Sequence, residues 1–305
     1  MSRVEIVEVG PRDGLQNEAR SLTVESRLRF IQQLAGSGLK RIEVGAFVSP
    51  HWVPQMQGSL HLITEIYKRR KEFPKDVRFS ALVPNMKGMN DALSTPIPEV
   101  AVFGACSETF SRKNINCSID ESLERFAEVI AAAKKHNRKV RGYLSVAFGC
   151  PYEGKVAEAK VVALVKTYFK MGITEVSIGD TIGVATPKQV HSLLKKLKGK
   201  VPLSRIAMHL HDTRGTALAN VLASLERGVR IFDSSFGGLG GCPYAKGASG
   251  NLATDDLVYM LNGMGFKTGV DLEKLLISGP FVAAEVGHKL PSRLTQAGLP
   301  TLTKL

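Results

Sequence analysis

The sequence predicts an α/β protein built as a single (β/α)8 TIM barrel with a C-terminal helical appendage. Eight strand-like stretches alternate with eight helical patterns, which is the element order of a parallel barrel. No GxGxxG motif follows the first strand, which argues against a doubly wound dinucleotide-binding sheet. The connections after strands are long and most connections after helices are short, as in barrels whose strand-to-helix loops build the active face.

Short runs rich in apolar and β-branched residues mark the strands. They are expected at Val4–Val9, Arg41–Phe47, Val77–Val83, Glu99–Phe103, Val140–Phe148, Glu175–Gly179, Ile206–His211 and Ile231–Phe236. Segments with helical periodicity separate the strands. These helices are expected at Val24–Ala35, Leu60–Glu72, Asn85–Leu93, Ile119–His136, Val156–Met171, Pro187–Lys198, Ala217–Arg227 and Leu252–Leu261.

Residues 1–264 are therefore expected to form the catalytic barrel. The long loops after strands are Gly10–Thr23, Val48–Ser59, Gly104–Ser118 and Gly237–Asn251. Residues 265–305 follow the eighth helix, and within them Val270–Leu276 and Pro280–His288 look helical before Pro291 breaks the pattern. We expect residues 265–305 to pack on the barrel as an extension rather than to form a second domain.

The composition is that of an ordinary globular protein, with 44% hydrophobic and 23% charged residues in 305, enough for a sizeable core. No apolar run approaches the roughly 18 residues that span a bilayer, so no membrane partner is expected. Strand-like sequence begins by Val4 and leaves no room for a leader, which predicts a cytoplasmic location. The cysteines lack metal-binding spacing and are expected to be reduced thiols: Cys106, Cys117, Cys150 and Cys242.

The formal charge of +13 raises the question of nucleic-acid binding. The densest basic runs are Lys68–Lys71, Lys134–Arg141 and Lys195–Lys200. They lie at or just beyond predicted helix C-termini, where cations complement the helix dipole, and no aromatic residues interleave them as in single-strand binders. No nucleic-acid partner is therefore expected, and a non-catalytic basic binding protein is an alternative that rests on charge alone.

Two histidines close the seventh predicted strand, in the stretch Ala207–Thr213. Residues two apart on a strand point to the same face, so His209 and His211 present two imidazoles side by side. A buried imidazole pair needs polar partners, and a shared divalent cation supplies them. Two core histidines bonded to backbone carbonyls are the alternative, and this stretch alone does not separate the two.

Asp13 and Asn251 extend the histidine pair to a candidate metal site. Asp13 follows the first strand and Asn251 closes the loop after the eighth, and in a barrel these loops share a face with the end of the seventh strand. Carboxylate, imidazole and amide donors without a thiolate suit Mg²⁺ or Mn²⁺ better than structural zinc. Asp13 by itself would be a turn residue before Gly14, so the prediction depends on the convergence of the loops.

Arg12 directly precedes the candidate ligand Asp13. It could form a salt bridge to Glu43 or Asp180, or it could stabilise a developing oxyanion in carbon–carbon bond cleavage. Glu43 lies on the second strand and Asp180 at the end of the sixth. Both are expected to support the site by holding Arg12 or a histidine in place.

Cys242 follows four glycines in the loop after the eighth strand. Most cysteines are small core residues, but glycines free the backbone to move, as in a loop that closes over substrate. A thiol there could move a proton on and off carbon or oxygen if its neighbours lower its pKa. Cys242 is therefore predicted to be catalytic.

Six segments spread over nearly the whole chain carry a family resemblance. They are Val7–Asn17, Phe47–Pro50, Trp52–Met56, Lys113–Asn116, His209–Asn220 and Gly237–Asn251. With these segments the sequence resembles the 3-hydroxy-3-methylglutaryl-CoA lyases of the metal-dependent TIM-barrel lyase superfamily. The Gly-Gly-Leu-Gly-Gly-Cys-Pro-Tyr-Ala segment is specific for the lyase branch.

The resemblance implies a retro-Claisen cleavage of 3-hydroxy-3-methylglutaryl-CoA to acetyl-CoA and acetoacetate, with Mg²⁺ or Mn²⁺ as cofactor and a homodimer as the assembly. It implies a metal site made of Asp13, His209, His211 and Asn251. It implies that Arg12 polarises the substrate oxygens and that Cys242 is the loop thiol needed for turnover. As a hypothesis for the mechanism, His209 or the Cys242 thiolate acts as the base and Cys242 protonates the enolate. Glu43 and Asp180 match acidic positions that support activity. Residues expected at the acyl-CoA substrate are Arg12, Gln16, Lys113 and Asn114, the last two in the loop after the fourth strand.

Two segments depart from the family pattern near the expected acyl pocket. Gly45-Ala46 stands where Thr-Ser is frequent, and Ser234-Ser235-Phe236 precedes the glycine loop where smaller residues are common. A lyase for another 3-hydroxyacyl-CoA is therefore one alternative. A condensing barrel enzyme, such as an isopropylmalate or citramalate synthase, is another, although those enzymes commonly carry extra domains.

Overall fold

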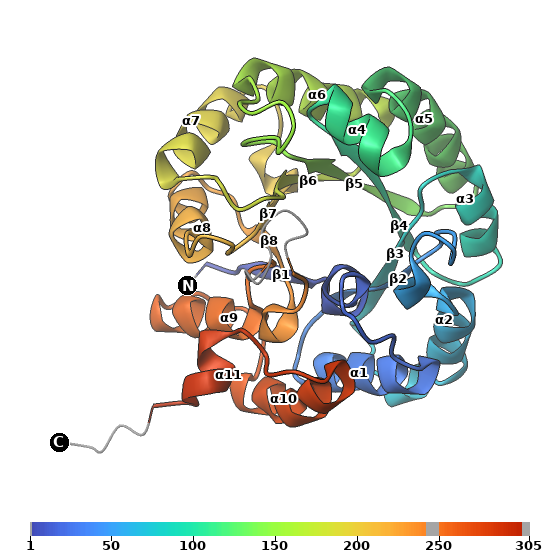
Figure 1. The fold of residues 1–305 in the computed structure, drawn as a ribbon, viewed down its shortest axis with the longest axis vertical. Coiled ribbons are helices and arrows are strands. Elements are labelled where there is room, and N and C mark those ends of the chain that lie inside the picture. The colour runs from blue at the N-terminus through green and yellow to red at the C-terminus, as the bar shows by residue number, and fades with distance from the viewer. Residues whose placement is uncertain (1, 242–249, 301–305) are drawn as a thin grey trace.

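In the computed structural model, which describes residues 2–241 and 250–300, eight parallel strands close into a barrel in chain order (Figure 1). The strands are β1 (Glu5–Glu8), β2 (Arg41–Ala46), β3 (Arg78–Leu82), β4 (Glu99–Ala105), β5 (Lys139–Ser145), β6 (Glu175–Asp180), β7 (Ile206–Leu210) and β8 (Ile231–Ser234). The ring closes where β8 pairs with β1, Glu8 lying opposite Ser234. The predicted (β/α)8 architecture is confirmed.

The helices surround this ring of strands in Figure 1. They are α1 (Val24–Gly36), α2 (Ser59–Lys68), α3 (Met86–Leu93), α4 (Glu108–Ile115), α5 (Ile119–Lys135), α6 (Glu158–Met171), α7 (Pro187–Leu197), α8 (Ala217–Glu226), α9 (Thr254–Gly263), α10 (Leu272–Val286) and α11 (Arg293–Ala297). Their apolar faces and the outer faces of the strands form one continuous hydrophobic core. Within the described ranges, every helix is too short or too polar to span a membrane.

Helix α4 occupies a segment that was predicted to be a loop. It begins after Ser107, whose hydroxyl accepts a hydrogen bond from the backbone N–H of Phe110. The only buried side chains on α4 are those of Phe110 and Ser111. Because so little of the helix faces the core, its sequence carries almost no apolar periodicity, and the prediction of a loop was wrong.

Helix α10 is continuous where the sequence predicted two helices. Pro280 lies inside it, and a proline in a helix removes one backbone hydrogen bond and usually kinks or ends the helix. Leu275 and Val282 are fully buried on either side of Pro280, and α10 packs against α1 and α9. Burial of this apolar face outweighs the missing hydrogen bond, so the helix persists.

Charged side chains fill much of the barrel interior, in contrast to the layers of branched apolar residues that are common in such barrels. Arg41 on β2 binds both carboxylate oxygens of Glu175 on β6 at 2.9 Å. Arg141 on β5 donates from Nε to the same carboxylate at 2.6 Å. Arg141 also makes a bidentate pair with Asp233 on β8, at 2.6 and 3.1 Å. These ion pairs connect opposite strands across the barrel.

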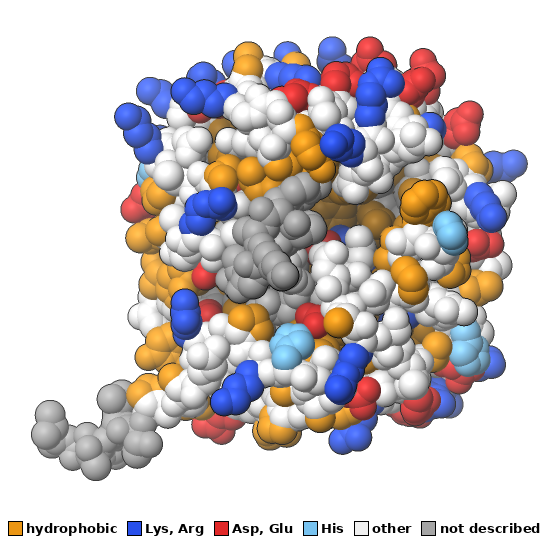
Figure 2. Space-filling view, viewed as in Figure 1, with side chains coloured by type: hydrophobic (Ala, Val, Ile, Leu, Met, Phe, Trp, Pro, Cys, Tyr) orange, Lys and Arg blue, Asp and Glu red, His pale blue; other side chains and the backbone are white. Residues whose placement is uncertain are grey.

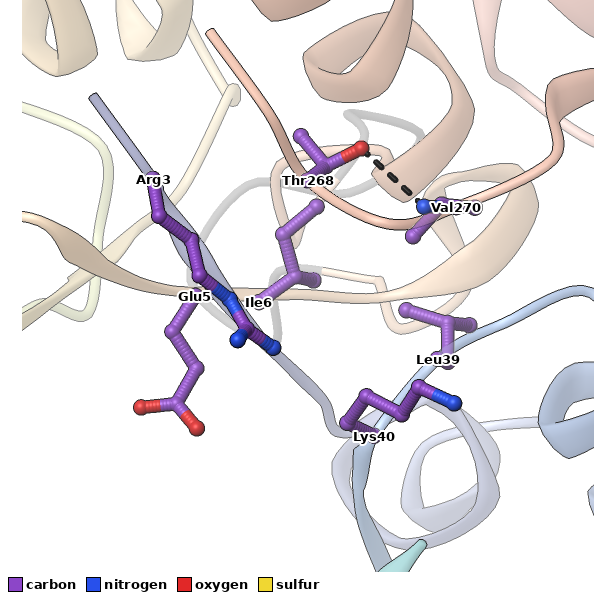
Figure 3. A pocket seen from close by; sticks show the side chains of 7 residues that line it. All are labelled: Arg3, Glu5, Ile6, Leu39, Lys40, Thr268 and Val270. Carbon is purple, nitrogen blue, oxygen red and sulfur yellow. Dashed lines mark hydrogen bonds between the residues drawn. The ribbon is translucent and has the colours of Figure 1, made fainter. Parts of the chain in front are cut away.

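A small hollow lies where the strands begin, at the end of the barrel away from the strand-to-helix loops (Figure 3). Its volume of about 10 Å³ has room for a single water molecule. Its lining residues are Arg3, Glu5, Ile6, Leu39, Lys40, Thr268 and Val270. The hollow is too small for an organic substrate, so the functional site has to be sought at the other end.

Glu8 joins the two segments that follow β1 and β8. Its Oε1 accepts the backbone N–H groups of Gly10 at 2.8 Å and Phe236 at 2.9 Å. Its Oε2 accepts the hydroxyl of Thr254, at the start of α9, at 2.6 Å. Burial raises the pKa of Glu8 to about 7, although these three hydrogen bonds act in the opposite direction.

The raised pKa of Glu8 predicts that part of the stability is lost on alkalinisation. The folded carboxyl binds its proton up to about pH 7, whereas the unfolded carboxyl releases it near 4.5. The contribution is therefore fully present below 4.5 and is lost as the pH rises through 7. Glu8→Gln keeps an acceptor for both N–H groups, and it should gain about 2–3 kcal/mol relative to wild type between pH 5 and pH 8.5.

Denaturant titrations at the two pH values measure this difference. Glu273→Gln, on an exposed turn of α10, serves as the control and should track wild type at both. An equal stability gap between Glu8→Gln and wild type at pH 5 and pH 8.5 would contradict the prediction.

Candidate metal centre and active site

The four predicted metal ligands converge at the end of the barrel formed by the strand-to-helix loops. Donor atoms of Asp13, His209 and His211 lie within 4.8 Å of one another. The two histidine Nε2 atoms are 3.2 Å apart, and the Nε2 of His209 lies 3.8 Å from Oδ2 of Asp13. Asn251 joins them through a 2.9 Å hydrogen bond from its Nδ2 to the same Asp13 oxygen.

A tight π-turn at Gly10–Gly14 carries Asp13 to this position. The carbonyl of Val9 accepts the backbone N–H groups of Arg12, Asp13 and Gly14, the shortest of these bonds being 2.7 Å. Pro11 sits at the start of the turn, where its missing N–H costs nothing. The turn follows the end of β1 and places Arg12 beside Glu43 and Asp13 beside His209.

Asn251 is held by the glycine segment that follows β8. Its Nδ2 donates to the carbonyl of Leu239 at 3.2 Å, and its backbone N–H donates to the carbonyl of Gly240 at 3.3 Å. Gly240 has a φ of +99°, and a Cβ there would lie 2.6 Å from Nδ2 of Asn251. The close approach therefore requires glycine at this position.

Charge and hydrogen bonding at the cluster fit a divalent cation. Burial lowers the pKa of His211 to about 3, so this imidazole is neutral and carries a lone pair. Burial raises the pKa of Asp13, but the charge of Arg12 and, to a smaller extent, the hydrogen bond from Asn251 lower it to about 2. The buried Oδ1 of Asn251 has no hydrogen-bond partner among the described residues.

The spacing of the imidazoles agrees with this interpretation. Two imidazoles whose Nε2 atoms face each other at 3.2 Å gain little from direct contact when both nitrogens carry lone pairs. Adjacent ligands of an octahedral cation at about 2.1 Å are separated by about 3 Å. An anionic carboxylate, two imidazoles and an unpaired amide oxygen thus form a donor set that a hard or borderline cation would satisfy.

Arg12 lies beside the cluster in a network of buried groups. Its Nε donates to Oε1 of Glu43 and its Nη1 to Oδ1 of Asp13. Glu43 in turn accepts the hydroxyl of Tyr143 at 2.8 Å, and the Tyr143 ring lies under the guanidinium. Burial alone would lower the pKa of Arg12, but the charges of Glu43 and Asp13 outweigh this effect and raise the pKa above its usual value. The guanidinium is thus a cation held between two carboxylates, those of Glu43 and Asp13.

Asp180 does not contact Arg12, contrary to one of the two salt bridges considered for it. Its carboxylate accepts the backbone N–H groups of Val184 at 2.9 Å and Ala185 at 3.0 Å. Burial raises the pKa of Asp180. Asp180 therefore fixes the loop between β6 and α7 by hydrogen bonds to its backbone.

Sequence reasoning missed Tyr143 and Asp233, which both face the site from inside the barrel. Tyr143 touches Glu43 and Arg12, and Asp233 lies 3.3 Å from Nδ1 of His209. Asp233 is the one acidic residue in the predicted strand Ile231–Phe236. An acid in such an apolar run has to find a buried partner, and this signal could have pointed to it. Tyr143 gave no comparable signal.

The three residues that were predicted to contact the substrate in addition to Arg12 lie in two separate segments. Gln16 follows the π-turn and is partly exposed. Lys113 and Asn114 are exposed on helix α4, not in a loop, and the Lys113 ammonium lies over the ring of Tyr152. Neither side chain contacts the Asp13–His209–His211 cluster in the described ranges. Cys242 lies outside the described residues.

Basic side chains do not gather into one patch on the face that Figure 2 shows. Lysines and arginines are dispersed around its rim, with acidic and apolar side chains between them. Such a distribution differs from the basic stripe that marks a nucleic-acid footprint. The basic side chains on this face are therefore spread out rather than focused at one place.

The fold and the donor set define a class: a (β/α)8 barrel with a candidate divalent-metal centre at the end where such barrels place their active sites. A family model described as HMGL-like matches residues 3–282. Human mitochondrial hydroxymethylglutaryl-CoA lyase is 51% identical over 295 residues, which cover 97% of this chain and 89% of that protein. The chain belongs to the HMGL-like family.

Solved structures agree with this assignment. Hydroxymethylglutaryl-CoA lyase from Pseudomonas aeruginosa is 48% identical with a TM-score of 0.92, and the match covers 97% of both chains. An HMG-CoA lyase from Acinetobacter baumannii in complex with coenzyme A and 3-methylmalate is 36% identical with a TM-score of 0.92, covering 99% of this chain and 98% of that one. The fold of these solved structures thus matches nearly the whole of this chain.

The unpaired amide oxygen of Asn251 predicts a measurable role in cation binding. Asn251→Ala removes one donor from the set, and Mn²⁺ affinity should fall by about 10- to 100-fold or more. Titration of free Mn²⁺ by electron paramagnetic resonance measures the affinity without turnover. Asn220→Ala is a matched control, because Asn220 is also buried with an unpaired Oδ1 but lies on α8. Equal affinity for wild type and Asn251→Ala would remove Asn251 from the site.

Proposed function

We propose that this protein is a divalent-metal-dependent carbon–carbon lyase that cleaves 3-hydroxy-3-methylglutaryl-CoA to acetyl-CoA and acetoacetate. The observation that carries the proposal is the convergence of Asp13, His209, His211 and Asn251 beside Arg12. The chain that carries these residues is about half identical, over nearly its full length, to hydroxymethylglutaryl-CoA lyases. The Acinetobacter baumannii complex with coenzyme A supports an acyl-CoA as the substrate class.

We propose Mg²⁺ or Mn²⁺ as the cofactor, held by Asp13, His209, His211 and Asn251. Oxygen and imidazole donors without a thiolate favour these cations. When bound, the cation would act as a Lewis acid that lowers the pKa of a substrate hydroxyl. In the structure, the 2.9 Å hydrogen bond from Asn251 to Asp13 sets the orientation of the amide.

Arg12 would stabilise the negative charge that develops when the C2–C3 bond breaks. Its Nε and Nη1 are used by Glu43 and Asp13, while Nη2 makes no hydrogen bond to the described residues. Nη2 is therefore the group that can donate to a substrate oxygen. Glu43 and Tyr143 hold the guanidinium plane, so the donor is in place before the charge develops.

Proton transfer requires a group other than the fixed ligands. His209 directs Nε2 to the cluster and Nδ1 to Asp233, so neither nitrogen is free to take the hydroxyl proton. Of the two bases considered, we therefore propose Cys242, which would also return a proton to the enolate carbon of acetyl-CoA. Asp180 would assist by fixing the neighbouring loop through Val184 and Ala185.

The remaining assignments are proposals of the same kind. Gln16 would contact the substrate beside Arg12, and Lys113 and Asn114 would contact the acyl-CoA from helix α4. A homodimer, a cytoplasmic location and the absence of nucleic-acid and membrane partners stay predictions. The human relative is mitochondrial, so similarity alone does not decide the compartment.

A coupled assay for acetoacetate tests the proposed function. Purified protein with 3-hydroxy-3-methylglutaryl-CoA and Mg²⁺ should release acetoacetate, EDTA should abolish the release, and Mn²⁺ or Mg²⁺ in excess should restore it. A second 3-hydroxyacyl-CoA in a parallel arm distinguishes the alternative lyase. Activity that is unchanged by EDTA, or absent with this substrate, would overturn the proposal.

Arg12→Gln tests the oxyanion role. Loss of one such donor typically lowers kcat by roughly 100- to 1000-fold, and Mn²⁺ affinity should stay near normal because Arg12 is not a ligand. Steady-state kinetics and Mn²⁺ titration measure the two effects separately. Arg69→Gln, on the surface at the end of α2, should leave both unchanged. A variant that keeps most of its kcat would refute the role of Arg12.

A further inference from the structure

Asp233 occupies a position inside the barrel that the proposed function leaves unexplained. It lies on β8 directly opposite His209 on β7, and its side chain is fully buried. Oδ1 accepts from Nη2 of Arg141 at 2.6 Å, and Oδ2 accepts from Nη1 at 3.1 Å. Oδ2 also accepts the hydroxyl of Ser177 at 2.7 Å. Nδ1 of His209 lies 3.3 Å from the same oxygen.

These contacts fix the direction of the hydrogen bond to His209. A guanidinium can only donate, and Arg141 engages both carboxylate oxygens, so Asp233 acts as an acceptor on each side. Its Oδ2 can form a hydrogen bond with His209 only if Nδ1 carries the proton. With the proton on Nδ1, the ring nitrogen that can offer a lone pair to a cation is Nε2, the atom that faces His211 and Asp13.

We propose that Asp233 is a positioning residue of the metal centre, which holds His209 in the Nδ1–H tautomer and orients its Nε2 toward the cation, while Arg141 and Ser177 hold Asp233. The inference rests on the metal site proposed above and adds a requirement to it. His211 has no such anchor among the described residues, because its buried Nδ1 lacks a hydrogen-bond partner there. The orientation of the imidazole pair therefore depends on Asp233.

A purely structural role for Asp233, as the counter-ion of Arg141, makes a different prediction. Arg141 has a second carboxylate partner, Glu175, which accepts from its Nε at 2.6 Å. Glu175 also binds Arg41 but has no contact with His209. If only the charge balance of Arg141 mattered, loss of either carboxylate would have similar effects. If tautomer control matters, only the loss of the Asp233 carboxylate affects the metal centre.

Mn²⁺ titration of three metal-free proteins tests the proposal: wild type, Asp233→Asn and Glu175→Gln. Asp233→Asn can present its NH₂ to Nδ1, which favours the wrong tautomer, and its Mn²⁺ affinity should fall about 10- to 100-fold, as for loss of other groups that orient a ligand. Glu175→Gln should bind Mn²⁺ like wild type. Equal affinity in Asp233→Asn and wild type, or equal weakening in both variants, would overturn the proposal.

A measurement on the unaltered protein keeps the test independent of how the variants fold. In ¹⁵N-histidine-labelled wild type, two-bond proton–nitrogen spectra distinguish a protonated from an unprotonated ring nitrogen, and the His209 signals are assigned by their loss in His209→Gln. We expect Nδ1 of His209 to carry a proton. An unprotonated Nδ1 would overturn the inference. A wild-type protein that binds no Mn²⁺ would instead refute the metal site itself.

Discussion

The bidentate ion pair between Arg141 and Asp233 is the contact on which the interior of this barrel depends. It joins β5 to β8 across the lumen, and Glu175 continues it to Arg41 on β2. Breaking one partner of such a buried pair typically costs about 3–5 kcal/mol, because a charge is left without compensation. The chain of alternating charges ends at His209, so the stability of the lumen and the geometry of the site share the same residues.

Beyond this lumen, at the end of the barrel that carries the site, individual carboxylates fix the positions of the strand-to-helix loops. Glu8 binds the segments after β1 and β8 together, and Asp180 fixes the loop after β6. Asp255 adds a contact to the glycine segment by accepting the N–H of Gly237 at 3.0 Å. Each carboxylate accepts hydrogen bonds from backbone N–H groups that lie outside the strand pairing. Such groups are costly to bury without a partner. The site is thus built on loops whose backbones are fixed by side chains.

The departure from the family pattern at Gly45 has a local explanation on the helix side of β2. A Cβ at Gly45 would approach Nη2 of Arg27 to 3.1 Å and Oγ of Ser59 to 2.8 Å. Arg27, buried on α1, fills this space and donates to the carbonyls of Val44 and Gln57 at 3.3 and 3.0 Å. The absent side chain therefore makes room for an arginine that supports the loop after β2, whereas Glu43 on the same strand faces the site.

The sequence by itself determined the eight-fold alternation, the active end of the barrel and the residues that converge there, because strand periodicity and loop length are local properties. It also indicated Asp13, His209, His211 and Asn251, since the ends of parallel strands meet at one edge. Only the tertiary structure decided that Arg12 binds Glu43 and not Asp180, that α10 continues through Pro280, and that Tyr143, Arg141 and Asp233 belong to the site. These outcomes depend on which side chains meet across the lumen, and residues distant in sequence are paired there by packing and charge rather than by any local pattern.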